Sequence, residues 1–144
     1  MAVTPFVGPG KLYLGDTDPD VATLYCETSG NVLTDAAGVY SEVVECGTVS
    51  ALGRADWELD VDMVQSGDSA GLSQYSLTNR GKVVGFYFVP SGAEPAAVTA
   101  DNPAYTGQVL VQVFDIGGPS TSLATASRTW KVQGDITQVT TPPA

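Results

Sequence analysis

The sequence predicts a mainly β domain: an antiparallel β-sandwich or open barrel with one short flanking helix and a long inter-strand loop. First, the 144 residues are 43% apolar and only 15% charged, which is typical of one folded domain and not of a disordered chain. Second, 16 glycines and 9 prolines indicate many turns in a short chain. Third, Val, Thr, Tyr and Phe are frequent while strong helix formers are scarce, which favours strands. We therefore expect a single domain over residues 1–144.

The first third of the chain predicts two strands and then a long excursion. Residues 7–15 form a turn and a strand, residues 16–20 break it, and residues 21–28 form a second strand. Over residues 29–53 the apolar pattern becomes weak and small and polar residues predominate. We therefore expect a loop there, with one strand near residues 40–49. A loop of this length usually has a task such as contacting a partner. Its candidate contact residues are Asp35, Tyr40, Glu42 and Glu45.

The clearest pattern in the chain is the alternation between Trp57 and Met63. Apolar side chains fall on one face and carboxylates on the other, which predicts a half-buried strand with an acidic outer face. The apolar face holds Trp57, Leu59, Val61 and Met63, and the acidic face holds Glu58, Asp60 and Asp62.

One helix and an apolar strand follow. Residues 66–69 offer turn and N-cap chemistry, and residues 72–79 can form a helix that packs Leu72 and Tyr75 inward and stops at Gly81. Residues 82–89 are apolar at nearly every position, which indicates a strand covered on both faces.

The last third predicts two further strand regions. After a loop over residues 91–103, residues 105–116 form a long strand that is also apolar on both faces, and residues 125–139 form a final strand or hairpin. Residues 140–144 form an extended tail. Two strands apolar on both faces indicate that a partner covers one of those faces. The expected core anchors are Trp57, Tyr75, Phe86, Phe88 and Trp130.

The charge distribution argues against a nucleic-acid-binding protein. Residues 1–68 contain two basic and twelve acidic side chains and residues 69–144 contain four of each, so the whole net charge of −10 lies in the first half. Affinity for a phosphate backbone comes mainly from Lys and Arg, so this balance suits a surface that repels DNA. No apolar stretch is long enough for a membrane span and no signal peptide is evident, so we expect folding in a cytoplasm.

The motifs that suggest chemistry are incomplete. Residues 67–71 fit the nucleophile-elbow pattern G-x-S-x-G, but the chain contains no histidine to accept the serine proton, so we expect no enzyme. Asp16, Asp18, Asp20 and Glu27 match four positions of a calcium loop, although Val21 stands where the turn needs glycine. A weak cation site at residues 16–20 stays open, and no cofactor is expected. Cys26 and Cys46 are expected to be buried free thiols, with a disulfide between them left open.

The order of these features resembles the major tail tube proteins of long-tailed phages with non-contractile tails. The similarity lies in residues 8–16, 57–63, 71–81, 86–90 and 105–118 and in the stretch Thr129-Trp-Lys-Val-Gln-Gly134, so it covers most of the chain outside residues 29–53. Each segment is degenerate alone, and their order and spacing carry the resemblance.

The resemblance implies a virion protein that is assembled in the host cytoplasm and forms hexameric rings. In that family the rings stack into a tube through which DNA passes, sheets of neighbouring subunits join into an inner barrel, and long loops contact the next ring. It also implies partners such as the tape measure and terminator proteins. Glu58, Asp60 and Asp62 would then face the lumen, and residues 35–53 would contact the next ring.

Other interpretations remain. The three acids can equally be the solvated outer face of any antiparallel sheet. A capsid decoration protein or a tail-tip module would share the acidic, β-rich composition. An extracellular ligand-binding β-sandwich would instead be a stable monomer with a small-molecule ligand.

Overall fold

The computed structural model describes residues 10–15, 23–24, 28–65, 71–118 and 124–142. Ten strands, one α-helix and one short 3-10 helix lie within them, which confirms the mainly β fold class. In chain order the elements are β1 (Lys11–Gly15), β2 (Thr23–Leu24), β3 (Thr28–Asp35), β4 (Val39–Val44), β5 (Gly47–Leu52), β6 (Trp57–Val64), α1 (Leu72–Thr78), β7 (Val83–Val89), η1 (Pro95–Ala97), β8 (Ala104–Leu110), β9 (Thr125–Lys131) and β10 (Thr137–Val139).

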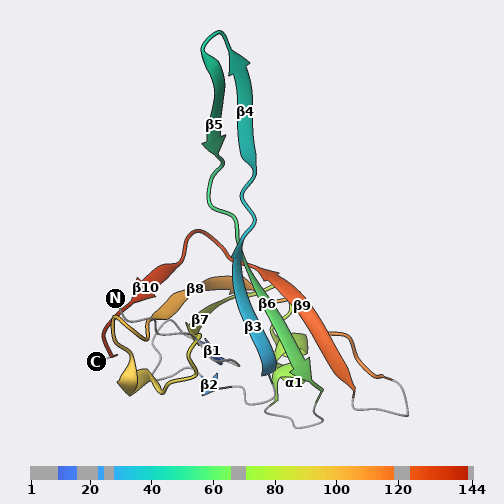
Figure 1. Ribbon diagram of the computed structural model, residues 1–144. Coiled ribbons are helices and arrows are strands. Elements are labelled where there is room, and N and C mark those ends of the chain that lie inside the picture. Colours follow the sequence, from blue (N-terminus) through green and yellow to red (C-terminus); the bar gives the residue numbers. More distant parts are fainter. Residues whose placement is uncertain (1–9, 16–22, 25–27, 66–70, 119–123, 143–144) are drawn as a thin grey trace.

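Two antiparallel sheets face each other, and a two-stranded hairpin projects from them (Figure 1). The larger sheet has the strand order β10-β8-β7-β1-β2, and the smaller one has the order β3-β6-β9. We call them the five-stranded sheet and the three-stranded sheet. The arrangement is a sandwich, and no closed barrel is formed by the described strands.

The core lies between the two sheets. Alternation along β6 turns Leu59, Val61 and Met63 inward, where each is at most 1% exposed. The five-stranded sheet contributes Phe86 and Phe88 from β7, and the cluster is completed by residues including Leu12, Leu14, Leu72, Val109, Val111, Phe114 and Trp130. Trp57 and Tyr75 are half-buried and pack against this cluster.

The strand β7 is buried on both faces, and the second cover comes from the chain itself. Tyr87 and Val89 point away from the three-stranded sheet and pack in a second cluster with Tyr13, Val98 and Ala104. Tyr13 and Ala104 belong to the neighbouring strands of the same sheet, and Ala93 and Val98 of the loop between β7 and β8 supply the cover that we expected from a partner. The second face of β7 is therefore buried within the chain, and the apolar pattern of this strand alone does not indicate a partner.

The second predicted two-faced strand is shorter than expected. The strand β8 ends at Leu110, and the following residues run irregularly. Val111 and Phe114 are both buried although they are three residues apart, a spacing that period-two alternation in a strand cannot provide. Ile116, at the end of the predicted strand, is 79% exposed.

Residues 125–139 form two separate strands. The strand β9 pairs with β6 in the three-stranded sheet, and β10 pairs with β8 in the five-stranded sheet. Gly134 between them has a φ of 85°, a conformation that favours glycine, and it lies where the chain passes from one sheet to the other.

The helix α1 lies close to its predicted position and ends at Thr78, with Asn79 as its C-cap. Its N-cap is Gly71, without a side-chain hydrogen bond. The predicted N-cap residues 66–69 lie outside the described residues, as does most of the pattern over residues 67–71. Gly81, the predicted stop, has a φ of 78°.

We predict that Leu59→Ala lowers the free energy of unfolding by about 2–5 kcal/mol, because it leaves a cavity in a fully buried position. Urea denaturation followed by tryptophan fluorescence would measure it. Val32→Ala is the control: Val32 lies on the neighbouring strand, is 55% exposed, and should cost less than about 1 kcal/mol. Equal costs at the two positions would contradict the assigned core.

Candidate functional site

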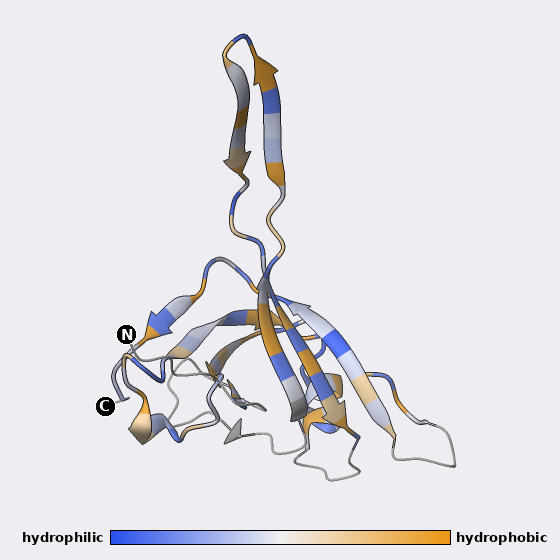
Figure 2. Cartoon of the chain, in the orientation of Figure 1, coloured by the Kyte–Doolittle hydropathy of each residue, from blue (hydrophilic) through white to orange (hydrophobic). Residues whose placement is uncertain are grey.

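The most unusual surface is the hairpin of β4 and β5, which stands away from the two sheets (Figure 1). Every residue of both strands is exposed. Of the ten large apolar side chains that are exposed among the described residues, six lie here: Val39, Tyr40, Val43, Val44, Val49 and Leu52. Figure 2 shows hydrophobic residues along both of its strands. Residues 29–53 are therefore not mainly a loop but β3 followed by a projecting hairpin.

Both faces of this hairpin are apolar. The register pairs Val39 with Leu52 and Tyr40 with Ala51. Alternation therefore puts Val39, Val43 and Leu52 on one face and Tyr40, Val44 and Val49 on the other. A two-stranded hairpin alone is at best marginally stable in water, and contiguous exposed apolar surface marks an interaction site. The exposed apolar side chains on both faces are typical of a segment that another molecule covers on both faces.

The base of the hairpin is clamped by Asp35, the last residue of β3. Its Oδ1 atom accepts hydrogen bonds from the backbone N–H groups of Ala37 and Asp56, each at 3.0 Å. Just above, the Gly53 N–H donates to the Gly38 carbonyl at 2.7 Å. Asp35 thus holds the two ends of the hairpin together, and its predicted role as a contact residue stays a prediction.

The tip is a tight turn made by Glu45 and Cys46. Cys46 is an exposed free thiol, so the expectation that it is buried is wrong. Cys26 and the candidate cation residues 16–20 and Glu27 lie outside the described residues. Tyr40, Glu42 and Glu45 are exposed on the hairpin, as a contact segment requires.

A second surface is the outer face of the three-stranded sheet, where Glu58, Asp60 and Asp62 lie on the central strand β6. The neighbouring strand β9 provides a partner for each of them. Glu58 forms an ion pair with Lys131 at 2.7 Å, Asp60 accepts a hydrogen bond from Thr129, and Asp62 accepts one from Ser127. The alternation predicted from the sequence is confirmed, and three carboxylates face one ammonium group across this surface.

Lys131 is held by two carboxylates. Hydrogen bonds to Glu58 and to Asp56 raise the pKa of Lys131 above its usual value. The lysine therefore stays charged and neutralises only part of this face, so that the surface keeps a negative sign at neutral pH.

Among the described strands, both edges of the three-stranded sheet lack a further paired strand, although Val132, the residue after β9, bridges to Val109 of β8. The edge strands β3 and β9 each pair only with β6 among the described strands. Exposed strand edges carry unpaired backbone N–H and C=O groups, which invite pairing with another chain. The sheet that carries the acidic face is thus the sheet that can be extended on both sides.

The described residues contain no group of three His, Cys, Asp or Glu side chains placed to hold a metal ion. No helix within those residues is long and apolar enough to cross a membrane. No protein-family model matches the chain, and no curated protein matches it.

The sequence prediction placed one strand near residues 40–49, where the structure has two, β4 and β5, joined by a tight turn. The signal was available, because residues 39–44 and 47–52 are two β-branched-rich segments separated by two residues, with Gly47 after the turn. The small residues within them obscured it.

We predict that Asp35→Ala loosens the hairpin without unfolding the two sheets. It removes two hydrogen bonds at the hairpin base, so the amide protons of β4 and β5 should exchange faster while the melting midpoint of the body changes little. Hydrogen exchange read by mass spectrometry would measure this, with Glu42→Ala as the control. Unchanged exchange in Asp35→Ala would show that the clamp has no role.

Proposed function

We propose that this protein is a structural subunit that assembles with copies of itself into stacked rings, forming a tube that conducts DNA, as the major tail tube proteins of long-tailed phages do. The proposal assigns the chain no enzymatic role. Its partners are other copies of itself and the proteins at the ends and in the lumen of the tube, and its location is the virion tail.

The observation that carries the proposal is the projecting hairpin with two apolar faces. Six exposed apolar side chains on a segment without support from its own chain are a liability for a monomer. They are an advantage for a subunit whose neighbours cover them. A strand of six residues extends about 20 Å at roughly 3.3 Å per residue, enough to reach well into a neighbouring subunit.

The three-stranded sheet supports the second part of the proposal. If β3 of one copy pairs with β9 of the next, the open edges are satisfied and a ring of copies closes into a continuous barrel. In such a barrel the outer face of this sheet, with Glu58, Asp60 and Asp62, lines the lumen. Carboxylates on that surface would repel DNA phosphates and keep the passing DNA from adhering.

We expect that serine at two hairpin positions, Val43→Ser and Val49→Ser, prevents assembly and leaves the fold intact. These side chains are 80% and 60% exposed and lie on opposite faces, so the melting midpoint should hardly move. Sedimentation velocity and electron microscopy would follow ring and tube formation. The matched control is Ile116→Ser, since Ile116 is 79% exposed but lies outside the hairpin. Tubes from the double variant at the wild-type protein concentration would contradict the role of the hairpin.

Reversing the charge of two side chains on the acidic face tests whether this face lines the lumen. Tubes of an Asp60→Lys, Asp62→Lys variant should retain DNA that wild-type tubes release, because lysines attract the phosphate backbone. DNA retained by pelleted tubes at low and high salt is the readout. The control variant, Asp101→Lys with Asp135→Lys, has the same net charge with the changes at exposed positions outside this sheet. Equal retention by both variants would remove Asp60 and Asp62 from the lumen.

A further inference from the structure

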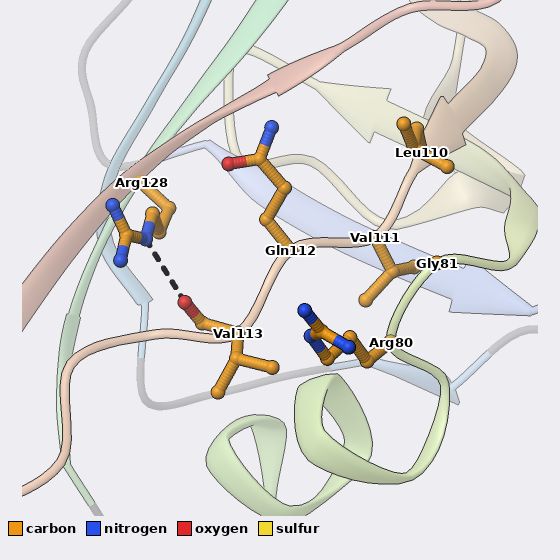
Figure 3. A pocket seen from close by; sticks show the side chains of 7 residues that line it. All are labelled: Arg80, Gly81, Leu110, Val111, Gln112, Val113 and Arg128. Atoms are coloured by element: carbon orange, nitrogen blue, oxygen red, sulfur yellow. Dashed lines mark hydrogen bonds between the residues drawn. The ribbon is translucent and has the colours of Figure 1, made fainter.

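A pocket beside the edge strand β9 is lined by two arginines, Arg80 and Arg128. It has a volume of about 510 Å³ and is lined by the segment 110–113 together with Arg80, Gly81 and Arg128. Figure 3 shows Arg80, from the turn after α1, and Arg128, from β9, on opposite sides of that segment. We call it the arginine pocket.

The two arginines differ in how they are held. The Arg128 Nε atom donates to the Val113 carbonyl at 2.9 Å, and its guanidinium lies 3.3 Å from Asp115 in an exposed ion pair. Arg80 is exposed and makes no hydrogen bond or ion pair within the described part of the chain. No carboxylate lines the pocket. Arg128 is thus a fixed part of the wall, and Arg80 is a cation available to a partner.

The hairpin has the complementary charge. Residues 38–53 contain Glu42 and Glu45 and no Lys or Arg. Glu45 occupies the turn at the tip, the first part of the hairpin to meet another molecule. The apolar side chains beside it match the half-buried Leu110 and Val113 of the pocket wall.

We infer that the hairpin tip of one copy docks in the arginine pocket of a second copy, with Glu45 of the first against Arg80 of the second. The inference rests on the proposed function and names the surface that receives the hairpin. The two surfaces lie at different places on the molecule, so the contact is heterologous. A heterologous contact that does not close into a ring continues without limit, which is the geometry needed to stack one ring on the next.

This docking makes assembly depend on complementary charge. An exposed ion pair in an interface mainly adds specificity and speed of association, and salt screens it. The critical protein concentration for tube formation should therefore rise with salt in the wild type.

The test is a charge swap between tip and pocket. Glu45→Arg alone and Arg80→Glu alone should each raise the critical concentration for tube formation about tenfold, since each places like charges together. The double variant Glu45→Arg with Arg80→Glu should return it to within about threefold of wild type. Lys82→Glu is the control: Lys82 is exposed and close in sequence, but does not line the pocket, and should have little effect. Thermal melting of each variant shows that the fold is retained.

The outcomes separate the two proposals. If wild-type protein forms tubes and both single variants do so at the same concentration, or the double variant is no better than the single variants, the pocket is not the receptor and the tube function stands. An effect of Lys82→Glu equal to that of Arg80→Glu also overturns the pocket. If wild-type protein stays monomeric at every concentration, the tube function fails and the docking with it.

Discussion

The alternation along β6 fixes most of this architecture. Leu59, Val61 and Met63 are almost completely buried against the five-stranded sheet, which commits the strand to one register. The same register sends Glu58, Asp60 and Asp62 to the opposite face, where β9 supplies their hydrogen-bonding partners. A slip by one residue would bury three carboxylates, at a cost far above the stability of a domain of this size. The register of β6 therefore determines both the core and the acidic face.

The position of the hairpin follows from the same strand. The strand β3 pairs with β6 along nearly its whole length, so their ends meet at Asp35 and Trp57. The residues between them must leave the sheet and return at one point, which Asp35 closes through two backbone N–H groups. Two sheets with a shared core thus hold a segment whose residues are all exposed. The assembly proposal rests on this contrast between a body that buries both faces of β7 and a hairpin that buries neither of its own.

Much of the fold could be predicted from the sequence, because strong period-two patterns and turn residues are local signals. The strand from Trp57, the helix from Leu72 and the apolar strand ending at Val89 all lie within a few residues of their predicted positions. The errors came from features that only tertiary structure decides. The cover over Tyr87 and Val89 comes from Ala93 and Val98 in the following loop, and the strand β8 ends early because Val111 and Phe114 both turn into the core. The arginine pocket could not be found at all, since Arg80 and Arg128 are distant in sequence.

Cryo-electron microscopy of the assembled wild-type protein would show directly whether the chain forms a tube and which sheet lines it. We expect a tube of stacked rings in which the three-stranded sheets of neighbouring copies join, with the face of Glu58, Asp60 and Asp62 toward the lumen and the β4–β5 hairpin covered by other copies. A particle in which this hairpin remains exposed to solvent, or a tube lined by the five-stranded sheet, would contradict it.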